Sequence, residues 1–234
     1  MALINYHFKN FIRSYKWIGP SITFFILLAI TYFYSGQPIM SSFASTSMLL
    51  LFITAWLTII ILDTDSIKEK QLLFTQLKTK GTYLTSKLIF SFLVILPLGL
   101  CAIMLPIITF RFEQMPNLME IVLGLYSHAI VIALGVIMTT LVRAITKRSD
   151  KFIWLFIVLI LLLSILRVVI IQTFPILKFV LWFLPPISDF LTLLNRASSK
   201  IFDISFLFVN LWMIGYLIVM WVILYVIFNK SEYL

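Results

Sequence analysis

Long apolar stretches alternate with short polar segments along the chain of 234 residues. A helix that crosses a bilayer needs about 20 mostly apolar residues. Six stretches approach or exceed this length, and the pattern therefore predicts six membrane-spanning helices. They lie at about 17–34, 42–62, 83–110, 118–141, 152–171 and 204–228.

The first 16 residues place apolar side chains at helical spacing instead of in a continuous run. The apolar positions are Ile4, Phe8, Phe11, Ile12 and Tyr15, and the basic residues on another face are Lys9, Arg13 and Lys16. This pattern predicts an amphipathic helix that lies in the membrane interface, with its basic side toward anionic headgroups. The alternative for this segment is a frayed tail.

The segment from 174 to 200 interrupts the pattern of spans. It contains Pro175, Pro185 and Pro186, and the apolar run at 176–184 includes Lys178. That run is too short to cross a bilayer. We expect two short re-entrant or extracellular helices here, which dip into the membrane or lie on it.

Composition places the chain among integral membrane proteins. Hydrophobic residues make up 62% of it, and charged residues 12%, which is about half the charged share of a soluble domain. These values exclude a soluble globular protein and a disordered one. The loops leave no room for a soluble catalytic domain of about 100 residues. We therefore expect one all-α transmembrane domain over residues 1–234.

The net charge of +9 follows the positive-inside rule better than it indicates nucleic-acid binding. Thirteen Lys and Arg residues lie in the N-terminal segment, the 63–87 region, the 143–151 loop and the C-terminal tail. Four lie in the loops on the opposite side. This asymmetry predicts that both termini are cytoplasmic, and we expect a lipid bilayer but no nucleic acid among the partners.

The sequence contains none of the motifs that would indicate catalysis in this chain. It has no GxxxxGK[ST] phosphate loop and no HExxH metal motif. Cys101 is the only cysteine, which excludes an internal disulfide. Neighbouring helical residues point to different faces, so we expect that Ser127 and His128 form no catalytic dyad and that His128 hydrogen-bonds to another helix. We predict no catalytic residue, no metal ligand and no bound cofactor.

The polar segment between the second and third spans predicts a short cytosolic helix over 66–80. Ser66 and Glu69 have the spacing of a capping box. Lys78 and Lys80 favour its last turn, and Gly81 suits the C-terminal cap. Its apolar side chains are Leu72, Leu73, Phe74 and Leu77.

These apolar side chains need a cover, because exposed apolar surface is unfavourable in water. The N-terminal helix, the membrane surface and a partner protein are the three candidates. The simpler interpretation of the segment is a solvated loop that happens to be helical.

Arg167 lies past the middle of the fifth predicted span, where an unpaired charge is costly. One interpretation is that its side chain extends outward to water. The other is that it faces a water-filled path or an anionic group of a substrate. Asp189 and Asp203 are candidate partners, and Glu113 and Glu120 lie near the same surface.

Taken together, these features resemble the membrane-spanning permease subunits of ABC-2 type exporters, over essentially the whole chain. They are the basic helix before the first span, the 63–90 stretch that joins the second and third spans, the short basic loop at 143–151, the short helices at 174–200 and the absence of an ATPase domain from the sequence. The stretch from Asp65 to Lys87 is most similar: an acidic start leads into a Leu-rich helix, then a Tyr, then a Ser-Lys that opens the third span. Many relatives place an acidic residue closer to the Leu-rich run than this chain does.

The resemblance implies that the 66–80 segment is a coupling helix that docks on a separate cytosolic ATPase subunit. The contact residues carried over by position are Ile67, Glu69, Leu72, Leu73, Phe74 and Leu77. ATP and magnesium would belong to that ATPase, and a second membrane subunit, identical or related, would complete a dimer. The 174–200 segment would cap the substrate path, to which Arg167 is a candidate contributor.

The resemblance further implies a bacterial cell membrane and an exporter of amphipathic or hydrophobic substrates. Several such subunits transport peptides or give resistance to antimicrobial peptides, including bacteriocins and phenol-soluble modulins. The alternative is a non-transporting membrane protein, an immunity or sensor subunit that binds a peptide or partner. A membrane-embedded enzyme is disfavoured by the missing motifs and the acid-poor spans.

Overall fold

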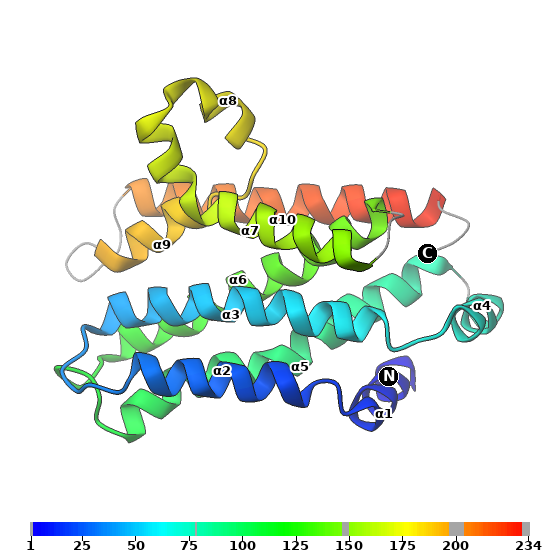
Figure 1. Ribbon diagram of the computed structural model, residues 1–234, viewed down its shortest axis with the longest axis horizontal. Coiled ribbons are helices and arrows are strands. Elements are labelled where there is room, and N and C mark those ends of the chain that lie inside the picture. The colour runs from blue at the N-terminus through cyan, green and yellow to red at the C-terminus, as the bar shows by residue number, and fades with distance from the viewer. Residues whose placement is uncertain (1, 78, 147–149, 197–203, 231–234) are drawn as a thin grey trace.

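The structure is a computed structural model that describes residues 2–77, 79–146, 150–196 and 204–230 (Figure 1). Within these ranges, helices joined by turns and loops are the regular secondary structure, and an isolated backbone bridge pairs Gln37 with Phe112. The α-helices are α1 (Ala2–Ser14), α2 (Ile18–Thr31), α3 (Ile39–Leu62), α4 (Ile67–Gln76), α5 (Lys80–Ile108), α6 (Leu118–Ile145), α7 (Asp150–Thr173), α8 (Lys178–Leu181), α9 (Ile187–Arg196) and α10 (Ile204–Lys230), and η1 (Pro175–Leu177) is a short 3-10 helix.

Among the described residues, five helices are long and apolar enough to cross a membrane: α3, α5, α6, α7 and α10. A sixth candidate span is the pair of α1 and α2, which is bent by 79°. By helix length and hydropathy the protein is therefore a multi-pass membrane protein. Five of the six predicted spans are confirmed as long apolar helices. The first is shorter than predicted, because α2 has only 14 residues.

The bundle is built around α3 and α6, which are more buried than the other candidate spans. In Figure 1, α2 lies on one side of α3, and α7 and α10 lie on the other. Small residues let the two central helices approach each other closely. A Cβ added at Gly135 of α6 would lie 2.7 Å from Cγ2 of Thr54 in α3. Glycine is therefore required there for the two helices to pack as they do.

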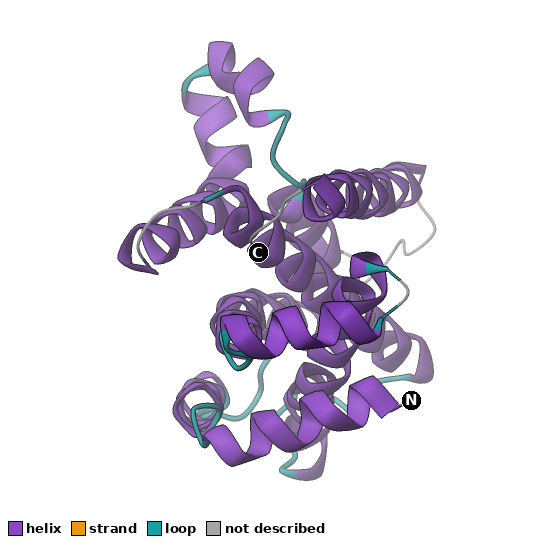
Figure 2. Ribbon diagram, turned by 90° about the vertical axis from the view of Figure 1, so that its right-hand side faces the viewer, coloured by secondary structure: helices purple, strands orange, loops and turns teal. Residues whose placement is uncertain are grey.

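Two helices lie across one end of the bundle, where the N-terminus and the C-terminal end of α10 also lie (Figures 1 and 2). These are α1 and α4. The chain turns from α1 into α2 at Tyr15, whose φ of 54° lies in the left-handed region. The predicted N-terminal helix is thus present. Because α1 lies across the end of the bundle, it does not run alongside the five long helices.

The helix predicted at 66–80 is shorter in the structure, and its C-terminal end was predicted wrongly. It ends at Gln76, because Leu77 is extended and the Thr79 hydroxyl accepts a hydrogen bond from the Thr82 N–H as the cap of α5. Lys80 and Gly81 therefore begin the next helix, and Lys78 lies outside the described residues. Gly81 lets the ring of Tyr225 approach α5 closely, since a Cβ there would lie 2.5 Å from that ring.

The segment predicted to hold two short helices contains three helical pieces in its described part. The first two, η1 and α8, project sideways from the bundle in Figure 1 and expose most of their apolar side chains. The third, α9, buries Ile187, Phe190 and Leu194 completely. Only α9 is therefore integrated into the core, while η1 and α8 present apolar surface outward.

Candidate functional site

The candidate site lies at the end of the bundle where α4 crosses it. The N-terminus of α4 is fixed by a complete capping box, as the sequence predicted. The Ser66 N–H donates to the Glu69 carboxylate at 2.6 Å, and the Glu69 N–H donates to the Ser66 hydroxyl at 3.3 Å. Both bonds satisfy N–H groups that a helix start otherwise leaves without partners. The capping box therefore sets where α4 begins after α3.

The apolar face of α4 packs against the protein itself. The Phe74 ring lies edge-on to Tyr83 of α5, with centroids 5.3 Å apart, and 6.3 Å from Phe228 of α10. Leu73 and Leu77 are partly buried against the same apolar core. The first turn of α5 and the last turns of α10 contact the partly buried Phe74 ring, so part of its cover comes from the bundle itself.

Five of the six residues predicted to contact an ATPase divide into two groups. Leu73, Phe74 and Leu77 face inward and attach α4 to the bundle. Leu72 is 61% exposed, and the Glu69 carboxylate is also exposed beside Ser66. Ile67 is the first residue of α4, but its side chain lies outside the described part of the structure. The outward face of α4 is therefore polar around a single leucine.

Directly before α4, Asp65 forms a buried ion pair with Lys87 of α5. The Lys87 Nζ lies 2.7 Å from Oδ2 of Asp65, and both side chains are at most 2% exposed. The Tyr83 hydroxyl donates to the same carboxylate oxygen at 2.7 Å. Lys87 also donates to the Ile61 carbonyl at the end of α3, at 2.9 Å. This pairing joins the end of α3, the start of α4 and α5 at one point.

The N-terminal helix closes this cluster from the other side. His7 of α1 is 1% exposed, and its Nε2 lies 3.2 Å from the Ser86 hydroxyl. Its Nδ1 lies 3.7 Å from Asp65. Asn10 donates to the second Asp65 oxygen at 3.4 Å. We call His7, Asp65, Tyr83, Ser86 and Lys87 the buried polar cluster.

Burial and charge set the protonation of the two members that lie outside the long helices. Burial lowers the pKa of His7 to about 4, and the nearby Lys87 ammonium acts in the same direction. Burial alone would raise the pKa of Asp65, but Lys87 and the Tyr83 hydroxyl hold it below its ordinary value. At neutral pH the cluster therefore contains a neutral imidazole beside a carboxylate–ammonium pair.

The sequence argument missed His7 as a member of this cluster, although a signal was present. His7 lies three residues after Ile4 and four before Phe11, which places it on the apolar face of the amphipathic helix. Asp65, Tyr83, Ser86 and Lys87 belong to the stretch that carried the family resemblance. A lysine inside a predicted span requires a partner, and Asp65 was one of few acids available.

Arg167, the candidate for the substrate path, is paired rather than extended toward water. Its side chain is 5% exposed, and its Nη1 lies 3.0 Å from Oδ2 of Asp189 in α9. Its guanidinium carbon lies 5.0 Å from the ring centroid of Trp212 in α10. Of the two candidate partners, Asp189 is the one that lies against Arg167 in the structure, and the guanidinium joins α7, α9 and α10. Of the other acids considered, Glu120 instead caps α6 through Asn117, and Asp203 lies outside the described residues.

His128 hydrogen-bonds to another helix, as predicted. Its Nε2 lies 3.1 Å from the Thr46 hydroxyl of α3, and its Nδ1 lies 2.8 Å from the Gly124 carbonyl. The Ser127 hydroxyl is closer than neighbouring helical positions suggested, at 3.4 Å from Nδ1. The contact with a carbonyl requires Nδ1 to donate, so this nitrogen is not available as a base for Ser127.

Searches against protein-family models, curated proteins and solved structures find no match to this chain. Within the described ranges, no group of three His, Cys, Asp or Glu side chains is placed to hold a metal ion. The functional argument therefore depends on the geometry of α4 and the buried polar cluster.

Proposed function

We propose that this chain is the membrane-spanning subunit of an ATP-driven exporter, and that α4 is its coupling helix. The supporting observation is the way α4 is held. Phe74 and the Asp65–Lys87 pair attach it to α5, while Leu72 and its polar neighbours point away from the bundle. A helix attached in this way moves with α5 as one rigid body. A force applied at its outward face would thus reach a membrane span.

The ATPase in this proposal is a separate cytosolic subunit that carries ATP and magnesium. The end of the bundle with α1, α4 and the end of α10 faces the cytoplasm, in agreement with the thirteen basic residues counted on that side. A second membrane subunit, identical or related, pairs with this chain around the path. The substrate is amphipathic or hydrophobic, and the family resemblance favours a peptide.

The experiment that tests this proposal is co-purification from the native host in a mild detergent. The tagged wild type is compared with Leu72→Asp, which places a charge at the centre of the outward face of α4. The matched control is Met115→Asp, because Met115 is equally exposed, at 61%, in the loop between α5 and α6. We expect a soluble ATPase with the wild type and with Met115→Asp, and at least about tenfold less of it with Leu72→Asp.

Three other results would each overturn a different part of the proposal. An ATPase bound equally by all three proteins would keep the exporter and reject the outward face of α4 as its contact. No ATPase from a monodisperse wild type would favour the non-transporting immunity or sensor subunit. Unchanged ATP-dependent export by an Arg167→Ala variant would remove Arg167 from the substrate path.

A further inference from the structure

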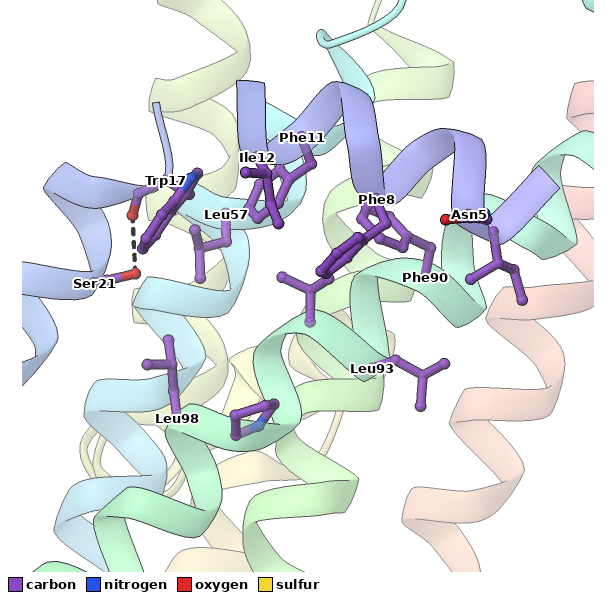
Figure 3. Close-up of a pocket in the computed structure, with 13 residues that line it drawn as sticks. Asn5, Phe8, Phe11, Ile12, Trp17, Ser21, Leu57, Phe90, Leu93 and Leu98 are labelled. Atoms are coloured by element: carbon purple, nitrogen blue, oxygen red, sulfur yellow. Dashed lines mark hydrogen bonds between the residues drawn. The ribbon is translucent and has the colours of Figure 1, made fainter. Parts of the chain in front are cut away.

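The corner between α1 and α2 encloses the cavity that Figure 3 shows, and it is not part of the proposed coupling device. Its volume is about 780 Å³, which lies within the roughly 300–1,000 Å³ of ligand sites in proteins. Phe8 and Ile12 of α1 form its roof, Trp17 closes the corner, and Leu93 and Pro97 of α5 form the opposite wall.

The shape and lining of this cavity suit one long apolar chain. Apart from Asn5 and Ser21, its lining residues are apolar. Along α5 it extends from Phe90 to Leu98, which is about 12 Å of helix. Apolar cavities of this kind do not hold ordered water, because water needs polar partners. A molecule that fits this lining is a hydrocarbon chain, lying roughly parallel to α5.

The basic residues of α1 near the cavity indicate what kind of molecule carries this hydrocarbon chain. Lys9 directly follows Phe8 and Arg13 directly follows Ile12, so each lies about a quarter-turn around α1 from a side chain that lines the cavity. Both are exposed, as is Lys16 at the corner. The sequence has no acidic residue before Asp63, so nothing within α1 or α2 opposes this charge. A basic rim next to an apolar cavity matches a molecule with an anionic head and an acyl tail.

We infer that this cavity binds an anionic phospholipid, with one acyl chain beneath α1 and the phosphate at Lys9, Arg13 and Lys16. The lipid supports the crosswise position of α1, because the space beneath the helix is filled by the chain. The inference does not depend on the proposed export function. It requires only that α1 lies at the membrane interface.

The first test uses the wild type in nanodiscs that contain a phosphatidylglycerol with a diazirine near the end of one acyl chain. After illumination, we expect cross-linked peptides from residues 4–21 and 90–98. Phosphatidylcholine with the same acyl chain is the control, and we expect roughly 10- to 100-fold less cross-linking from it, since each basic residue near a headgroup contributes about a factor of five. Equal labelling by the two lipids, or labelling confined to other helices, would overturn the inference.

The second test fills the cavity. Leu93→Trp narrows it, and Leu159→Trp is the matched control, because Leu159 of α7 is 48% exposed and Leu93 is 49%. We expect Leu93→Trp to lower cross-linking of 4–21 by about tenfold, while Leu159→Trp leaves it unchanged. Replacing Lys9, Arg13 and Lys16 by Gln should remove the preference for phosphatidylglycerol. A Leu93→Trp protein with wild-type labelling would show that the chain lies elsewhere, and competition of labelling by a second copy or a peptide would assign the cavity to that occupant.

Discussion

At the scale of single residues, the ion pair between Asp65 and Lys87 is the most consequential contact. Both groups are buried, and each has a second partner: the Tyr83 hydroxyl donates to the Asp65 carboxylate, and the Lys87 ammonium donates to the Ile61 carbonyl. Breaking a buried pair by removing one partner is strongly destabilising, because the remaining charge is left buried and unpaired. Removing both charges leaves no such penalty.

A double-variant cycle follows from this reasoning. We expect Asp65→Asn and Lys87→Met each to destabilise the protein by about 3–5 kcal/mol, and the double variant to cost clearly less than the sum. Thermal unfolding in detergent gives the melting temperatures of the wild type, the two single variants and the double variant, which are then compared. The control is Asp63→Asn, which breaks the pair with Arg143 at 3.0 Å, whose two side chains are 30–35% exposed, and should cost at most about 1 kcal/mol. Additive losses at Asp65 and Lys87 would contradict a direct pairing.

The neutral imidazole of His7 makes stability depend on pH. Its pKa is about 4 in the folded protein and about 6.5 when unfolded. Between these values the unfolded state holds a proton that the native state lacks. The contribution of His7 to the free energy of unfolding is therefore fully present above about pH 6.5 and is lost as the pH drops to about 4. The loss reaches about 3 kcal/mol. The lowered pKa of Asp65 acts in the same direction, because its contribution to stability is lost as the pH falls below the ordinary pKa of an aspartate.

Melting temperatures measured between pH 7 and pH 4 check this expectation. The wild type should become steadily less stable below pH 6.5, whereas His7→Gln should show a flatter profile across the same range. The charged groups that face His7 are Asp65 and Lys87, and both remain in the variant. A wild-type melting temperature that does not change from pH 7 to pH 5 would show that His7 is not buried as a neutral ring.

At the scale of helices, the sequence was most informative where one element decides its own structure. The capping box of α4 and the long apolar helices were predicted because caps and hydrophobicity act locally. The end of α4 was predicted wrongly, because Gly81 has two possible roles. Glycine suits a helix C-cap, but here it gives room to Tyr225 of α10, and a contact across 144 positions has no local signature.

The pairing of α7 with α9 gives a prediction at the same scale. Arg167 is almost fully buried, whereas Asp189 is about a third exposed. Asp189→Asn therefore leaves a buried charge without its partner, while Arg167→Met leaves a carboxylate that water can reach. We expect Asp189→Asn to cost about 1–3 kcal/mol, less than for a fully enclosed pair, and Arg167→Met to cost less than that. The two melting temperatures measure this difference, and the reverse order would mean that Trp212, not Asp189, stabilises the guanidinium.

At the scale of the whole molecule, the membrane class was predictable and the site only in part. Composition and the length of apolar runs predict the class because the bilayer imposes them on each span separately. The buried polar cluster combines residues 7, 65 and 83–87, and only the packing of α1 across α5 brings them together. Leu72 and Phe74 stand two positions apart in one helix, and one points outward while the other points inward. The sequence could not tell them apart, because it does not reveal which side of the helix the bundle occupies.

The assembly of the buried polar cluster also has a consequence for how the chain is made. The ribosome releases α1 first, but Ser86 and Lys87, which lie against His7 and Asp65, follow about 80 residues later. Until α5 has entered the bilayer, His7 lacks Ser86, and Asp65, which accepts from Asn10, lacks Lys87, so α1 must wait on the membrane surface, where its basic residues hold it. Docking of α1 therefore follows the insertion of α5, which supplies Ser86 and Lys87.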